Sequence, residues 1–153
     1  MQANITSTKT KPSIDTIARD CIAVRLRMLN RVVTNIYDDA LRPLDLKVSQ
    51  MNILVATAKM QIARPAVVCD RLQLDVSTLS RNVERMKARG WLEVVAVEDG
   101  RAQPFQLTNE GKVLLQKAAP LWKKAQKEAK ALLGGGIVEL LDKTASRLQD
   151  SSA

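Results

Sequence analysis

One stretch constrains the fold of this chain more than any other: residues 75–91, DVSTLSRNVERMKARGW. Leu79, Val83 and Met86 recur at the i, i+4, i+7 spacing of a single buried helical stripe. The stretch begins with aspartate, a favoured N-cap, and the glycine before its last residue lies where glycine commonly ends a helix. It therefore predicts an amphipathic helix that must bury one face against other elements.

The opposite face of this helix carries short hydroxyls followed by guanidiniums, at Ser77, Thr78, Arg81 and Arg85. Such side chains suit the base edges and phosphates of nucleic acid. A solvated basic face, which is usual on surface helices, explains the same residues equally well. The stretch by itself leaves both interpretations open.

The segments before this stretch favour the first interpretation. Pro65 can occupy the first turn of a short helix over residues 65–72, and Gln73 and Leu74 then link it to the stretch. Two short helices joined by a tight turn, the second with a polar N-terminus, form the helix-turn-helix pattern. Upstream, Ser49 is expected to cap a helix that is apolar on several sides and runs to about residue 60.

The segment after the stretch predicts a β-hairpin. Residues 92–97 are rich in β-branched side chains, the Asp-Gly pair at 99–100 suits a tight turn, and Phe105 and Leu107 alternate with a polar residue in the return strand. A hairpin in this place is the wing of a winged helix. Arg101, at its tip, is placed to enter a minor groove, and a solvated turn arginine is the alternative.

Both ends of the chain predict long amphipathic helices. Apolar residues recur at steps of three and four over residues 14–41, which predicts a helix of about 28 residues and roughly 42 Å. A small monomeric domain cannot cover such a length, so part of this face is expected to meet another chain. Thr108 is expected to cap a second long helix, 109–133, and the glycines at 134–136 separate it from a last one.

The charge of the chain narrows its partners. The 153 residues carry a formal net charge of +8, which favours nucleic acid, with an acidic protein or an anionic membrane surface as alternatives. No apolar run approaches the roughly 20 residues of a membrane span. The N-terminus, MQANITSTKTKPS, lacks the apolar segment of a signal peptide, so we expect a disordered basic arm on a cytoplasmic protein.

Cysteine and histidine usage argues against an enzyme. The chain has two cysteines, Cys21 and Cys69, and no histidine. Two thiols without a secretion signal favour a reducing compartment over a disulfide framework. The lack of histidine removes the usual general base and the commonest metal ligand. We therefore predict no catalytic residue, no metal site and no cofactor.

Residues 21–126 resemble, in the order and spacing of their motifs, the multiple antibiotic resistance regulator (MarR) family of bacterial winged-helix repressors. The motifs that carry the resemblance are YDDALRPLDLKVSQ, RLQLDVSTLSRNVERMKARGWLE, EDGR, LTNEG and APLWKKAQ. The resemblance implies a mainly α (α+β) fold, in which a winged helix-turn-helix is joined to a helical dimerisation domain built from both termini.

The resemblance also implies a homodimer in which the first helix and the last two helices of each chain interlock. The implied organisation is a disordered basic arm (1–12), a dimerisation helix (13–46), a winged helix-turn-helix DNA-binding lobe (47–108) and C-terminal dimerisation helices (109–150). Such a dimer would bind double-stranded DNA at a pseudo-palindromic operator, with one recognition helix per half-site.

The DNA-contacting residues follow from the same resemblance. Ser77, Thr78 and Arg81 correspond to residues that contact DNA in the family, and Arg101 corresponds to the wing arginine. Further side chains are placed to touch phosphates: Lys47, Ser49, Arg71, Asn82 and Arg85.

Two features depart from the family pattern. Val76 stands where many relatives carry arginine or another polar residue, so one DNA contact is either missing or replaced by contact with a thymine methyl. The wing has one arginine where relatives often have two or three, which places more of the binding on the helix.

The effector is the least defined part of this prediction. In the family, ligands or oxidants usually act in the cleft between the dimer helices and the DNA-binding lobe. Cys21 lies two residues from the position of the reactive cysteine in thiol-based peroxide sensors, about 200° away round a helix. Arg25 is placed to stabilise its thiolate, and an inert buried cysteine is the alternative. Cys69 is expected in the core, and no residue cluster defines a small-molecule effector.

We therefore predict a dimeric transcriptional regulator, specifically a repressor released by a small molecule or an oxidant, without membrane association. Phosphate neutralisation is expected to set the affinity and the recognition helix the specificity. The alternative is a winged-helix adaptor that binds an acidic partner without specific DNA recognition.

Overall fold

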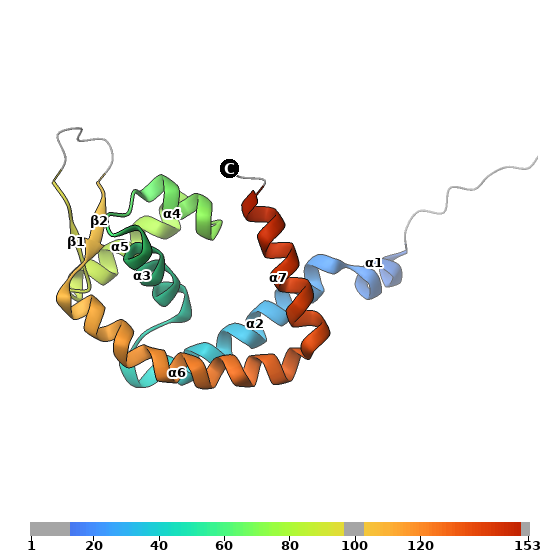
Figure 1. Ribbon diagram of the computed structural model, residues 1–153. Helices are drawn as coiled ribbons and strands as arrows, with labels where there is room; N and C mark the ends of the chain where they lie inside the picture. The colour runs from blue at the N-terminus through green and yellow to red at the C-terminus, as the bar shows by residue number, and fades with distance from the viewer. Residues whose placement is uncertain (1–12, 97–102, 151–153) are drawn as a thin grey trace, which may run out of the picture. The chain divides into compact units, whose positions relative to one another are not determined.

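Helices dominate the described part of the chain, residues 13–96 and 103–150 of the computed structural model (Figure 1). In chain order the elements are α1 (Ile14–Asp20), α2 (Ile22–Leu41), the 3-10 helix η1 (Arg42–Leu44), α3 (Val48–Met60), α4 (Pro65–Leu72), α5 (Val76–Ala88), β1 (Leu92–Val94), β2 (Phe105–Leu107), α6 (Asn109–Leu133) and α7 (Gly135–Asp150). This order confirms the predicted mainly helical winged helix. The chain forms two compact units that divide between Val33 and Thr34.

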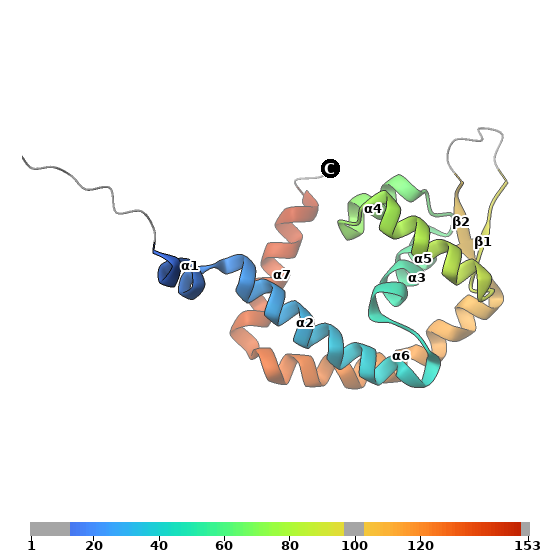
Figure 2. The ribbon, with the colours of Figure 1, turned by 180° about the vertical axis from the view of Figure 1, so that it is seen from behind.

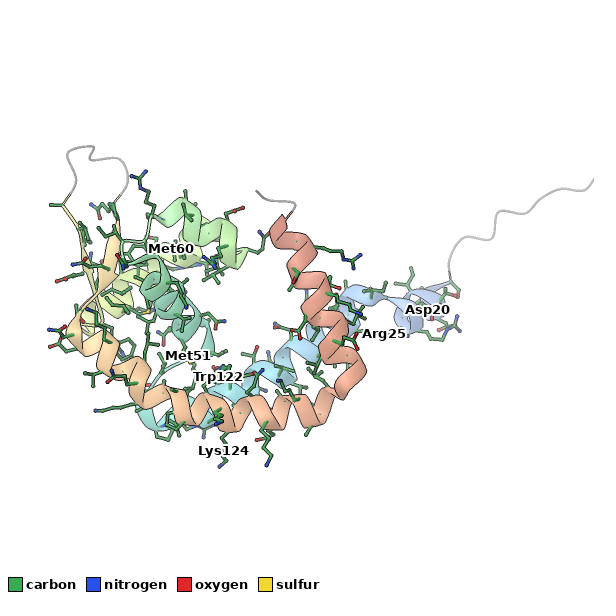
Figure 3. All side chains as sticks on the ribbon, in the orientation of Figure 1. Asp20, Arg25, Met51, Met60, Trp122 and Lys124 are labelled. Atoms are coloured by element: carbon green, nitrogen blue, oxygen red, sulfur yellow. The ribbon has the colours of Figure 1, made fainter. Side chains whose placement is uncertain are left out.

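The first unit corrects the prediction of one continuous N-terminal helix. Cys21 has extended backbone dihedrals and separates α1 from α2, with Asp20 and Arg25 on either side of the break (Figure 3). The Arg25 guanidinium donates to the carbonyl oxygen of Arg19, so it satisfies an acceptor near the end of α1. No residue of α1 is buried against the described chain, and the apolar repeat alone did not keep the helix continuous.

The helix-turn-helix lies in the second unit and consists of α4 and α5, which pack on each other and next to α3 (Figure 2). Both helices have the predicted bounds, and Gln73 turns the chain between them with a positive φ of 51°. At the end of α5, the amide of Gly90 donates to Lys87 and that of Trp91 to Met86, at 2.8 and 2.9 Å. This is a Schellman motif, and Gly90 supplies its left-handed residue with a φ of 73°.

The start of α3 differs from the prediction. Ser49 is not its N-cap, because the helix begins at Val48 and Lys47 is the capping residue. The Asp38 carboxylate accepts from the Val48 amide at 2.8 Å, and the Gln50 side chain accepts from the Lys47 amide at 3.1 Å. A partner ten residues upstream thus fixes the first turn.

A two-stranded antiparallel sheet follows α5, with Leu92 opposite Leu107 and Val94 opposite Phe105. β1 is shorter than the predicted strand, although the Val95 amide still donates to the Pro104 carbonyl oxygen at 2.8 Å. The predicted turn and the Arg101 side chain at its tip lie outside the described residues.

A third segment extends this sheet, and the sequence pattern did not indicate it. Ala63 pairs with Phe105 through two backbone hydrogen bonds of 2.8 and 3.0 Å. Phe105 is buried at the centre of the lobe. The link between α3 and α4 therefore anchors the wing to the helices.

The core of the second unit joins the helix-turn-helix to the sheet and to α6. The three residues of the α5 stripe are all buried, as predicted. The cluster they belong to consists of Leu41, Leu46, Met51, Ile53, Leu54, Ala63, Val68, Leu79, Val83, Met86, Leu92, Phe105, Leu107, Leu114 and Ala118. The orientation of α5 is fixed by this burial, which leaves its polar face outward.

Helix α6 has the predicted bounds and cap. The Thr108 hydroxyl accepts from the Gly111 amide at 3.0 Å and donates to the carbonyl oxygen of Gly90 at 2.6 Å, so this one residue ties α6 to the end of α5. α6 ends at Gly134, whose φ is 77°, whereas the two glycines that follow are already part of α7. The predicted three-glycine break is therefore a single residue.

Candidate nucleic-acid interface

The outward face of α5 is built on one carboxylate. Asp75 accepts the Thr78 amide at 2.8 Å, the Ser77 hydroxyl at 2.6 Å and the Thr78 hydroxyl at 2.7 Å. These hydrogen bonds, that of the Ser77 side chain above all, hold the pKa of Asp75 far below its ordinary value. The carboxylate stays ionised and caps the positive end of the helix.

The guanidiniums follow one and two turns later. Arg81 and Arg85 are exposed, and neither forms an ion pair with another described residue. The Arg81 Nη2 atom lies 3.5 Å from Thr78 Oγ1, a long contact that keeps the guanidinium beside the hydroxyls. The face therefore presents hydroxyls first and cations next, along one side of the helix.

The residues predicted to touch phosphates are less uniform. Ser49 and Arg71 are exposed on α3 and α4. Lys47 already pairs with the Asp38 carboxylate at 3.2 Å. Asn82 is half-buried, and its amide nitrogen donates to the Thr78 carbonyl oxygen at 2.9 Å. Lys47 and Asn82 thus have partners inside the protein.

Arg89 shows that basic residues of this segment do not all serve one purpose. Its guanidinium donates to the backbone oxygen of Asp45 at 2.8 Å and also to the Asp45 carboxylate. The same guanidinium lies over the Trp91 ring, 4.9 Å from the ring centre. Arg89 therefore fastens the end of α5 to the link after α2. Sequence reasoning assigned no role to Arg89.

The structure gives the two cysteines different surroundings. Cys69 is partly buried against the core of the second unit, as predicted. Cys21 is partly exposed at the break between α1 and α2, and both thiols are free. The Arg25 guanidinium, predicted to stabilise a Cys21 thiolate, donates to a backbone carbonyl oxygen.

A pocket of about 670 Å³ lies elsewhere on the second unit. It is lined by residues of α3, the sheet and the first turn of α6, among them Thr57, Glu93 and Lys112. α5 contributes none of its described lining residues. This pocket is therefore separate from the hydroxyl and guanidinium face.

Part of this chain is similar in sequence to a known protein family, and its fold is similar to that of solved proteins. The MarR family model matches residues 44–102. The transcriptional regulator MOSR of Mycobacterium tuberculosis, solved in complex with DNA, is 28% identical, covers 86% of this chain and 98% of its own, and has a TM-score of 0.74. Over residues 44–102, which include the helix-turn-helix, the chain resembles the MarR family. The family and fold are those of transcriptional regulators.

Two further MarR-family structures share the fold. A mutant MarR from E. coli in complex with operator DNA is 20% identical, covers 89% of this chain and 99% of its own, and has a TM-score of 0.77. BpsR of Bordetella bronchiseptica, whose DNA binding is regulated by 6-hydroxynicotinic acid, is 22% identical, covers 83% and 95%, and has a TM-score of 0.74. A comparison with curated proteins found no match.

Membrane spans and metal sites were the two other features that the composition argued against. No helix in the described ranges is both long and apolar enough to cross a bilayer. Within the same ranges, no group of three or more histidine, cysteine or acidic side chains is arranged to hold a metal ion.

Proposed function

We propose that this chain is a MarR-family regulator that binds a pseudo-palindromic DNA operator as a homodimer and represses transcription until an effector releases it. The observation that carries the proposal is the outward face of α5, where Ser77, Thr78 and Arg81 lie on a helix whose other side is buried. The fold that holds this face is shared with regulators solved on DNA.

The proposed DNA contacts fall into three groups. Ser77, Thr78 and Arg81 would contact bases in the major groove, and Arg101 would enter the adjacent minor groove. Phosphate contacts would come from Lys47, Ser49, Arg71, Asn82 and Arg85. Arg71 and Arg85 are the stronger candidates in this group, because Lys47 and Asn82 already have partners within the protein.

Exposed apolar side chains support the homodimer. In the first unit α1 and α2 expose Ile14, Ile17, Ile22, Val24, Leu26, Met28, Leu29 and Val32, and in the second unit α6 and α7 expose Leu132, Ile137, Leu140 and Leu141. Continuous apolar helix faces of this kind mark assembly surfaces. We assign dimerisation to residues 13–46 and 109–150, and DNA binding to residues 47–108.

We propose release by a small molecule, with release by an oxidant as the alternative. A relative of the same fold, BpsR, has its DNA binding regulated by 6-hydroxynicotinic acid. The oxidant alternative needs a Cys21 thiolate, and Arg25, the cation placed to stabilise it, is used by a backbone carbonyl oxygen.

Selection of bound sequences from a random DNA pool tests the proposal. We expect two inverted half-sites whose centres lie about one helical turn, 10–10.5 base pairs, or a multiple of it apart. A protein with α5 intact but no enriched sequence would contradict the proposal. It would favour the adaptor that uses its net charge of +8 on an acidic partner.

A further inference from the structure

We infer that the first turn of α5 reads the exocyclic amino groups of bases, with Ser77 and Thr78 acting only as hydrogen-bond acceptors. The inference rests on the proposed function, because it concerns the same DNA face. It assigns a direction to each hydrogen bond, which neither the family nor the fold specifies.

The proton of each hydroxyl is already used. A serine or threonine hydroxyl has one hydrogen to donate and two lone pairs to accept with. Ser77 donates to Asp75 Oδ1 at 2.6 Å, and Thr78 donates to Asp75 Oδ2 at 2.7 Å. An ionised carboxylate cannot donate in return, so the direction of both bonds is fixed. Because the pKa of Asp75 is strongly lowered, its carboxylate stays ionised throughout the pH range in which DNA is double-stranded.

This direction limits what the hydroxyls can bind. Phosphate oxygens, guanine O6 and N7, adenine N7 and thymine O4 are all acceptors, so a hydroxyl could bond them only by leaving Asp75. The exocyclic amino groups of adenine and cytosine are the donors of the major groove. Ser77 and Thr78 therefore select amino groups, and the negative charge of Asp75 keeps this turn away from phosphates.

Val76 favours adenine over cytosine as the source of the amino group. It lies between Asp75 and Ser77, and its side chain is 71% exposed at the first position of the helix. Apolar side chains contact the thymine methyl in the major groove. An A·T pair offers an adenine amino group, with one hydrogen left free by base pairing, and a thymine methyl on the same edge, so one pair can satisfy one of the hydroxyls and Val76 together.

The test uses the full-length protein and the operator obtained by selection, with single atoms changed in one half-site. Purine in place of adenine removes the amino group, and 7-deazaadenine removes only the N7 acceptor. We expect the first change to weaken binding roughly 5- to 10-fold, the size of one lost neutral hydrogen bond, and the second to have no effect. Replacing cytosine by 2-pyrimidinone removes the cytosine amino group in the same way and so tests cytosine as the donor.

The Asp75→Asn variant provides the matched protein control. Asparagine is as good an N-cap as aspartate, and circular dichroism checks that α5 is kept. Its amide can accept only through one oxygen, so one hydroxyl is released to donate. For the base that faces the released hydroxyl, we expect a smaller penalty for removing the amino group, because that hydroxyl can then donate to an acceptor, whereas the hydroxyl still held by the amide oxygen keeps its penalty. A wild-type protein that tolerates purine but is weakened by 7-deazaadenine would overturn the inference.

A second substitution tests Val76. Uracil in place of thymine removes only the methyl group, and we expect it to weaken the wild type a few-fold and to leave Val76→Ala unaffected. An equal loss in both proteins would remove Val76 from the inference. Failure of the selection itself would count against the proposed function, whereas an enriched operator without amino dependence would count against this inference alone.

Discussion

Arg81 and Arg89 stand on the same segment and have different surroundings. Arg81 is exposed beside the hydroxyls, whereas Arg89 is engaged by Asp45. We predict that Arg81→Ala costs roughly 1–3 kcal/mol of operator binding and relaxes base preference at one position. Titration of operator and random duplex by fluorescence anisotropy measures this. An equal loss on both duplexes would make Arg81 a phosphate contact. Arg89→Ala serves as the comparison, and its main effect should be a lower melting temperature.

Gly111 lies so close to the Trp91 backbone that the position has no room for a side chain. A Cβ atom there would lie 2.2 Å from the Trp91 carbonyl oxygen and 3.0 Å from Leu107 Cδ2. We predict that Gly111→Ala lowers the free energy of unfolding by roughly 1–3 kcal/mol, although alanine is the better helix former.

Gly136→Ala is the matched control for this prediction, because Gly136 is also helical and no atom lies within 4 Å of the position that a Cβ would occupy there. The substitution should leave stability unchanged or raise it by up to about 1 kcal/mol. Urea unfolding of both variants gives the comparison, and a Gly111→Ala protein as stable as the wild type would show that Trp91 can move away.

Among the elements, α7 has the clearest test. It contacts α6, yet Leu140 and Leu141 remain 61% and 49% exposed on it. We predict that a chain ending at Gly136 is monomeric or aggregates, because it lacks the apolar face of α7 that is proposed to pack against the second copy. Light scattering measures the mass, and a stable dimer would contradict the role of α7. Lys143→Ala, a change on the same helix that keeps its apolar residues, should leave the dimer intact.

The elements also differ in how far the sequence predicted them. α4, α5 and α6 have their predicted bounds, because their start signals are local. A proline with a fixed φ lies in the first turn of α4, and in α5 and α6 an aspartate and a threonine side chain accept the amide three residues on. The break at Cys21 was not predicted. A regular apolar repeat measures only amphipathicity, and the described chain buries no part of α1.

For the whole molecule, net charge and fold lead to a prediction about salt. With a charge of +8 and two recognition helices per dimer, we expect affinity for random duplex to fall on the order of 10³-fold between 50 and 200 mM salt, as six or more phosphate contacts require. Binding titrations at four salt concentrations give the slope. A slope near zero would favour the adaptor, since a protein that neutralises phosphates must release condensed counterions from the duplex.

Of the candidate site, too, one part could be predicted from the sequence and another could not. Which residues of α5 face outward could be predicted, since helical spacing alone assigns Leu79, Val83 and Met86 to the buried side. The direction of the hydroxyl bonds could not, because it depends on where the Asp75 carboxylate oxygens lie in the folded turn.

The sequence by itself determined much of the local order of this protein: the caps of α5 and α6, the buried stripe of α5 and the succession of helix-turn-helix, hairpin and α6. These depend on hydrogen bonds and spacings within a few residues, so no knowledge of the rest of the chain is needed. Only the tertiary structure decided the pairing of Ala63 with Phe105, the approach of Gly111 to Trp91 and the hold of Arg89 on Asp45. Each of these joins residues 20 to 44 positions apart, and the packing of the whole core is what brings them together.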